Sequence, residues 1–132
     1  MSRDTGPDTG LVVLVDDDDA VRSALEMLLA SCGWRVRAFA SPDDALAAAL
    51  PAGREGCLVV DYQMPGMNGL QLLDRLRAAG CHQPAILITG KVDGRPRLDR
   101  CAAARGLSTL LDKPLDADAL VAAIAALLAD GR

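Results

Sequence analysis

Acidic residues stand directly after two apolar segments, in positions where their side chains could do chemistry together. A run of four aspartates, beginning with Asp16 and Asp17, follows the first apolar segment, and Asp61 follows the third. In an open parallel sheet the carboxyl ends of the strands share one edge, and ligands bind there where the strand order reverses. If the two segments are neighbouring strands, Asp61 converges with Asp16 or Asp17.

Converging carboxylates require a cation. Two of them about 4 Å apart repel each other by roughly 4 kcal/mol at an effective dielectric constant of about 20. Proteins bind Mg²⁺ through one or two carboxylates together with phosphate oxygens and water, and Mn²⁺ prefers the same oxygen donors. We therefore expect Mg²⁺, or Mn²⁺ in its place, as the cofactor.

Three further groups follow other apolar segments at the same expected edge. Thr89 ends the fourth segment, Gly90 beside it permits a ligand to approach the backbone closely, and Lys113 follows the fifth. A carboxylate such as Asp61 can attack phosphorus and form an aspartyl phosphate. Phosphoryl transfer then needs mainly positioning and neutralised charge, which the cation, Lys113, Thr89 and the Gly90 amide could supply.

Each of these residues also has an ordinary structural interpretation. The aspartate run could be a solvated loop or a helix cap, with Asp18 or Asp19 as the capping residue. Lys113 could be a surface lysine, and Thr89 could simply end a strand. Convergence of polar groups from four strand ends favours the site over these alternatives.

Short apolar segments alternate with helical patterns five times, which predicts an α/β fold with a parallel sheet. Segments that are almost continuously apolar are typical of central strands, whereas the second segment alternates with arginine and suits an edge. The expected strands are Leu11–Val15, Arg35–Phe39, Cys57–Val60, Ala85–Thr89 and Thr109–Leu111.

Helix signals are clear for four of the five expected helices. Ser41 is a predicted N-cap followed by Pro42, and Gly33 and Gly80 stand where helices should end. The segment from Gly90 to Gly106 is charged, and its helix is expected to be short, mobile or shifted in register. The other predicted helices are Ala20–Ser31, one that begins at Pro42, one that carries Leu70, Leu73 and Leu76, and Ala117–Ala129.

Composition fits one domain. The 132 residues are 51% hydrophobic, with a disordered leader expected over residues 1–10 and the folded domain over 11–130. The net charge of −4 and the scattered basic residues argue against direct nucleic-acid binding. Four cysteines without a close pair indicate reduced thiols in the cytoplasm, and no apolar run is long enough to cross a bilayer.

The motifs LVVLVDDDDAVRSAL, CLVVDYQMPGMNGLQLL, PAILITG and LLDKP resemble, in order and spacing, those of response-regulator receiver domains. The likeness covers about Leu11 to Ala129 and is nearest to the nitrogen-fixation-type regulators, which also have Thr-Gly after the fourth strand. It implies a doubly wound, flavodoxin-like sheet of five parallel strands in the order 2-1-3-4-5, with helices on both faces.

The resemblance also implies a role for each matching residue. Asp61 is then the phosphorylated residue, Asp16 and Asp17 are the metal-binding pair, and the Gln63 backbone carbonyl completes the metal shell. Thr89 provides the switch hydroxyl, and Lys113 pairs with the phosphate. We also expect Gln63 and Lys91 to set the lifetime of the phosphoryl group, because both side chains can border the path of attacking water.

The implied function is a phosphoacceptor of a two-component phosphorelay, not an enzyme beyond its own phosphorylation and dephosphorylation. The implied donor is a sensor histidine kinase or a phosphotransfer protein, and phosphorylation would switch binding to a downstream effector. A homodimer is common among look-alikes.

Two departures from the family pattern concern output. Leu110 stands where an aromatic residue usually turns inward on activation, and the stretch from Thr89 to Lys113 is slightly longer than in the nitrogen-fixation type. A degenerate receiver that acts as an interaction module independent of phosphorylation is therefore the alternative. An aspartate-nucleophile phosphatase is disfavoured, because Gln63 stands where such enzymes have a second acid.

Overall fold

The computed structural model describes residues 10–90, 100 and 107–130. Apart from Gly10, the leader expected over residues 1–10 lies outside the described residues. The fourth helix was expected between Gly90 and Gly106, where only Gly90 and Arg100 are described, so this prediction also lies outside the described residues. The described elements are β1 Leu11–Val15, α1 Asp19–Ser31, β2 Arg35–Phe39, α2 Pro42–Ala47, β3 Cys57–Asp61, α3 Gly69–Ala78, β4 Ala85–Thr89, β5 Leu107–Asp112 and α5 Ala117–Asp130.

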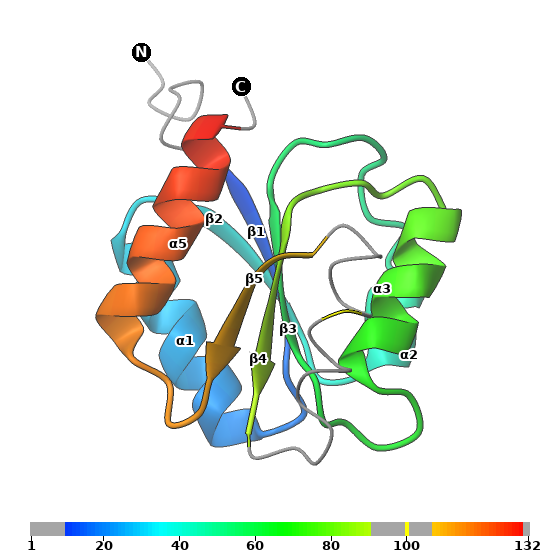
Figure 1. Cartoon of the computed structure of the whole chain (residues 1–132), viewed down its shortest axis with the longest axis horizontal. Helices are drawn as coiled ribbons and strands as arrows, with labels where there is room; N and C mark the ends of the chain where they lie inside the picture. Colours follow the sequence, from blue (N-terminus) through cyan, green and yellow to red (C-terminus); the bar gives the residue numbers. More distant parts are fainter. Residues whose placement is uncertain (1–9, 91–99, 101–106, 131–132) are drawn as a thin grey trace.

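The five strands form one parallel sheet in the order β2-β1-β3-β4-β5, which confirms the predicted fold (Figure 1). The nearly continuous apolar strands β1, β3 and β4 occupy the centre, and the mixed strand β2 lies at an edge as its arginines predicted. β1 is therefore hydrogen-bonded to β3, which is the neighbour relation that the acidic site required.

Helices α1 and α5 cover one face of the sheet, and α2 and α3 cover the other (Figure 1). The pleat of each strand sends alternate residues to opposite faces, so Val13 and Val15 belong to the core under α2 and α3. Val12 and Leu14 belong to the core under α1 and α5. Both cores are aliphatic, and together they make the sheet a rigid support for its loops.

The helix ends follow the local sequence. Asp18 is the N-cap of α1 and accepts a hydrogen bond from the Val21 amide, while the Ser41 hydroxyl accepts from Asp44 at α2. Gly33 follows α1 with φ 94°, the left-handed conformation that ends a helix. These caps agree with the predicted boundaries to within one residue.

Two strands are longer than predicted. β3 ends at Asp61 itself, so this residue is the last of the strand rather than the first of the loop. β5 runs from Leu107 to Asp112 because it pairs with the whole of β4, whereas only its apolar centre was visible in the sequence.

The described cysteines Cys32, Cys57 and Cys81 are not paired with one another. Burial in the sheet raises the pKa of the Cys57 thiol to about 12, which makes it unreactive at neutral pH. Among the described residues, no helix combines the length and apolar character needed to span a bilayer.

Candidate functional site

Asp61 occupies the carboxyl end of the central strand β3. Its Cα pairs in register with that of Ile88 on β4, and its side chain is only 3% exposed. The following residue continues the strand pairing, because the Tyr62 amide donates to the Ile88 carbonyl at 2.8 Å. A buried carboxylate is thus held on a rigid backbone at the edge where ligands bind in such sheets.

Lys113 provides the nearest described cation. Its Nζ lies 3.1 Å from Asp61 Oδ1, and its amide donates to the Thr89 carbonyl at 2.8 Å, which anchors the lysine beside β4. Although the ion pair is short, Asp61 Oδ1 makes no hydrogen bond with any described group. The contact is therefore a charge attraction without hydrogen-bond alignment, and this buried oxygen retains its capacity to bind a further ligand.

Asp16 and Asp17 join Asp61 as the sequence predicted. One carboxylate oxygen from each of the three residues lies within 4.8 Å of those of the other two. Asp16 is 3% exposed, whereas Asp17 is exposed. The cluster therefore has a buried floor and a side that is open to solvent.

The backbone and side chain of Asp16 are both fixed. Its amide donates to the Phe39 carbonyl of β2 at 3.2 Å, and its Oδ1 accepts from the Asp18 amide at 2.9 Å. Burial, with a contribution from the charges of Asp61 and Asp17, raises the pKa of Asp16 above its usual 3.8, while the Asp18 amide and Lys113 partly offset this.

Thr89, Gly90 and Gln63 border the same edge. The Thr89 side chain is fully buried and its hydroxyl donates to the Gly90 carbonyl at 3.2 Å. A Cβ added at Gly90 would lie 3.4 Å from Gln63 Oε1 and 3.9 Å from Lys113 Cδ, so the absence of a side chain keeps this rim open. Lys91, which was expected beside them, lies outside the described residues.

The donor set fits a hard divalent cation. All three side chains offer carboxylate oxygens, the type of ligand that Mg²⁺ prefers, and one of those oxygens is buried without a hydrogen bond. Three carboxylates against the single charge of Lys113 leave a net negative site. Asp16, Asp17 and Asp61 are the residues that would hold the cation.

Two features of the site region were overlooked in the sequence. Asn68 and Gln71 form a reciprocal capping box that fixes the start of α3, and the Asn-x-x-Gln spacing would have revealed it. Arg22 bonds to both ends of the aspartate run, at the Asp16 carbonyl and at the Asp19 carboxylate. The i, i+3 spacing of Asp19 and Arg22 was the available signal.

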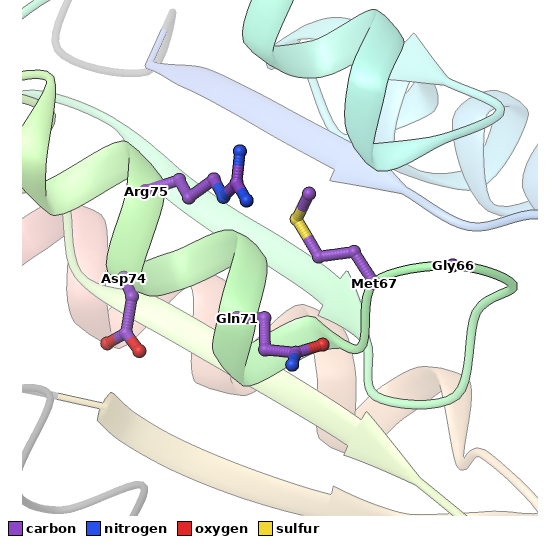
Figure 2. A pocket seen from close by; sticks show the side chains of 5 residues that line it. All are labelled: Gly66, Met67, Gln71, Asp74 and Arg75. Carbon is purple, nitrogen blue, oxygen red and sulfur yellow. The ribbon is translucent and has the colours of Figure 1, made fainter.

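A hollow of about 250 Å³ lies apart from the acidic cluster, beside the loop that precedes α3 (Figure 2). Gly66 and Met67 of the loop and three residues of α3 line it, and none of the predicted site residues does. The α3 residues are Gln71, Asp74 and Arg75.

Comparison with known protein families agrees with this geometry. Residues 12–125 match the family model of the response regulator receiver domain. The matched range runs from the second residue of β1 into α5 and includes all the residues of the acidic cluster.

The chain is also similar in sequence to individual response regulators. The chain is 41% identical over 122 residues to the transcriptional regulatory protein FixJ of Azorhizobium caulinodans, covering 92% of this chain and 56% of that protein. It is 38% identical to FixJ of Bradyrhizobium diazoefficiens, over 87% of this chain and 55% of that protein. The chain thus spans about half the length of these curated relatives.

A solved structure, full-length FixJ from B. japonicum, matches the fold with a TM-score of 0.80 at 33% identity. The match covers 93% of this chain and 59% of that one.

Proposed function

The chain belongs to the response-regulator receiver family, and from this premise we propose that it accepts a phosphoryl group on Asp61 from a phosphohistidine. The observation that carries the proposal is the state of Asp61. Its carboxylate is 3% exposed, lies 3.1 Å from an ammonium group and shares a cluster with two other carboxylates.

The proposed reaction is an in-line displacement. An Asp61 carboxylate oxygen forms a bond to phosphorus while the bond from phosphorus to the donor's histidine nitrogen breaks, and that nitrogen keeps the electron pair. In this proposal Lys113, whose Nζ lies 3.1 Å from Asp61 Oδ1, neutralises charge on a phosphoryl oxygen. The Thr89 hydroxyl and the Gly90 amide contribute hydrogen bonds to the phosphoryl group from the end of β4. Burial of Asp61 limits the access of water to the acyl phosphate.

A bound Mg²⁺ or Mn²⁺ would supply positive charge between the three carboxylates and the equatorial phosphoryl oxygens. In this proposal Asp16, Asp17 and Asp61 bind the cation through side-chain oxygens, and the Gln63 backbone carbonyl is the fourth protein ligand. Phosphorylation and dephosphorylation of its own Asp61 are the only reactions that the chain itself promotes.

The partners follow from the chemistry. The donor is a sensor histidine kinase or a phosphotransfer protein, and the recipient of the signal is an effector that distinguishes the two states of the domain. We propose that the exchange takes place in the cytoplasm and that a homodimer is one form of the regulator. Binding to nucleic acid is not part of the role proposed for residues 11–130.

Intact-protein mass spectrometry after incubation with a small phosphodonor and Mg²⁺ tests the proposal. The wild type should gain one phosphoryl group, and Asp61→Asn or a chelator should abolish the adduct. Asp74→Asn is a matched control, because Asp74 is an exposed aspartate on α3 that lies outside the cluster.

An adduct that survives Asp61→Asn would contradict the assignment of Asp61. A well-folded wild type that gains no phosphoryl group, either from small donors or from phosphorylated histidine kinases, would favour the alternative of an interaction module. Leu110 is the observation that keeps this alternative open, because it replaces the aromatic residue expected in the signalling path.

A further inference from the structure

Arg22 lies in the first turns of α1 and joins the two ends of the aspartate run. Its Nη1 donates to the Asp16 carbonyl oxygen at 3.0 Å, and its Nη2 donates to Asp19 Oδ1 at 2.6 Å. The side chain is 18% exposed, so most of it is packed against the protein. The planar fork of arginine suits two acceptors at fixed separation.

The two contacts differ in what they do. Asp19 is 86% exposed, and an exposed ion pair at i, i+3 spacing contributes little to stability. The bond to the carbonyl of Asp16, by contrast, acts on a residue that is 3% exposed and belongs to the acidic cluster. The guanidinium therefore links a solvent-exposed part of the helix to the backbone of a buried carboxylate.

Arg22 completes the restraint of Asp16. The Asp16 amide is held by Phe39 on β2, and its Oδ1 is held by the Asp18 amide. Arg22 holds the third group, the carbonyl. With amide, carbonyl and one carboxylate oxygen all engaged, the second carboxylate oxygen has a fixed direction.

This restraint matters because the carboxylates of the cluster repel one another. Asp16, Asp17 and Asp61 would move apart if the loop between β1 and α1 were free, and a spread cluster binds a small cation less tightly than a preformed one. The guanidinium bonds to the carbonyl rather than to the Asp16 carboxylate, so it does not occupy an oxygen that a cation would use.

We propose that Arg22 is a positioning residue for divalent-cation binding: by holding the Asp16 carbonyl and the Asp19 carboxylate together, it sets the direction of the Asp16 carboxylate. The proposal rests on the function proposed above, since it assumes that the acidic cluster binds a cation. The two hydrogen bonds of Arg22 have this role, and its positive charge alone would not be sufficient.

The test is direct binding of Mn²⁺ to the full chain, measured from the loss of the free-ion signal in electron paramagnetic resonance. Arg22→Met removes both bonds while keeping most of the apolar stem. We expect its Kd for Mn²⁺ to rise about tenfold, at the lower end of the effect of removing a group that orients a metal ligand. Arg22→Lys keeps the charge but cannot reproduce the fork, so it should recover less than half of the lost affinity on a logarithmic scale.

Arg77→Met is the matched control. Arg77 likewise makes two hydrogen bonds, in its case to the backbone carbonyls of Cys81 and Gln83, and it lies on α3, away from the acidic cluster. We expect both Arg22→Met and Arg77→Met to lower the melting temperature, because each loses two hydrogen bonds, but only Arg22→Met to change the Kd for Mn²⁺. Asp19→Asn, which weakens only the exposed pair, should change the Kd less than Arg22→Met.

The outcomes separate the two proposals. If the wild type binds Mn²⁺ and Arg22→Met binds it equally well, Arg22 has only a structural role and the inference is wrong. Full recovery by Arg22→Lys would also overturn it, because charge rather than geometry would then be sufficient. If the wild type does not bind Mn²⁺ at all, both the role of Arg22 and the metal-dependent part of the proposed function are wrong.

Discussion

At the scale of a single residue, the burial of Asp16 lowers the stability of the metal-free protein and favours the binding of a cation. A carboxylate that is 3% exposed and lies among other carboxylates is unfavourable in the absence of a cation, which is why its pKa is raised. The same burial and crowding would make a divalent cation bind well, because the cation removes the repulsion. Metal affinity and metal-free stability are therefore opposed at this position.

We expect Asp16→Asn to raise the melting temperature of the metal-free protein at pH 7 by a few degrees. Asn keeps an oxygen that can accept from the Asp18 amide but carries no charge. Because the folded-state pKa of Asp16 is raised, its destabilising charge is present above that pKa and is lost as the pH falls through it toward 3.8. The gain over wild type should therefore shrink on acidification.

Thermal melts in chelator from neutral to mildly acidic pH measure this effect. Asp18→Asn is the control, since Asp18 is exposed and Asn is an equally good N-cap, so its melting temperature should follow that of wild type. A lower melting temperature for Asp16→Asn at pH 7 would contradict the explanation.

The position of Gln63 leads to a prediction about the lifetime of the phosphoryl group. Its exposed side chain reaches the rim at Gly90, at the edge where water would approach a phosphorylated Asp61. We expect Gln63→Ala to shorten the half-life of the phosphorylated protein severalfold, measured by mass spectrometry after removal of the donor. His82→Ala, an exposed change before β4, should leave the half-life unaltered.

At the scale of elements, the start of α3 is fixed by close packing against the end of β3. The Gly69 amide donates to the Tyr62 carbonyl at 2.8 Å, and a Cβ at Gly69 would lie 2.7 Å from both the Asp61 carbonyl oxygen and Leu87 Cδ1. A side chain at this position would push α3 away from the strand that carries Asp61. The loop that contains Gln63 depends on this contact.

Gly69→Ala should therefore lower the free energy of unfolding by about 2 kcal/mol or more, the usual cost of overpacking a core. Gly66→Ala is the comparison, because Gly66 has φ 84° but nothing within 4 Å of its added Cβ. It should cost only the backbone strain of about 1 kcal/mol. Urea unfolding of both variants measures the difference, and equal losses would show that backbone strain alone explains them.

Strand β5 carries Leu110, the residue at which the sequence departs from the family pattern. Leu110 pairs in register with Leu87 of β4 and packs, partly buried, against the core under α2 and α3. Its side chain is only partly buried, and its strand is the last in the order of the sheet. Substitution there should therefore affect the surface around β5 more than the site at the strand ends.

We expect Leu110→Tyr to take up the phosphoryl group at Asp61 at the wild-type rate within about twofold, a difference of less than 1 kcal/mol in the barrier, and to change the binding of partners. Mass spectrometry with a small donor measures the first effect, and pull-down of effectors with phosphorylated protein measures the second. Loss of phosphorylation in a folded variant would show that Leu110 supports the site itself.

At the scale of the whole molecule, two aliphatic cores hold the sheet rigid while its carboxyl edge carries the charge. Asp61 and Lys113 arrive at that edge from β3 and from the end of β5, and Asp16 arrives from β1. A cation that binds only the folded arrangement must stabilise the whole domain, because unfolding separates these strands.

Mg²⁺ at ten times its Kd should accordingly raise the free energy of unfolding by about 1.4 kcal/mol, or the melting temperature by roughly 5 °C. Differential scanning calorimetry at constant ionic strength measures this rise, with Na⁺ as the control cation. The rise should be absent in Asp61→Asn. An equal rise in that variant would place the bound cation elsewhere.

The sequence by itself determined the elements and the identity of the candidate residues. Continuous apolar runs marked the central strands, arginines in Arg35–Phe39 marked an edge, and Ser41 with Pro42 marked the start of a helix, because these signals act locally. The motifs around Asp61 and Lys113 added the order of the strands through family resemblance, which the sheet confirmed.

Only the tertiary structure decided how the residues meet. The distance of 3.1 Å between Lys113 and Asp61, the unequal burial of Asp16 and Asp17, and the bond from Arg22 to the Asp16 carbonyl depend on contacts between separate segments. The length of β5 was likewise fixed by its pairing with β4. Local patterns encode which elements form, whereas distances between side chains follow from packing elements that are remote in the sequence.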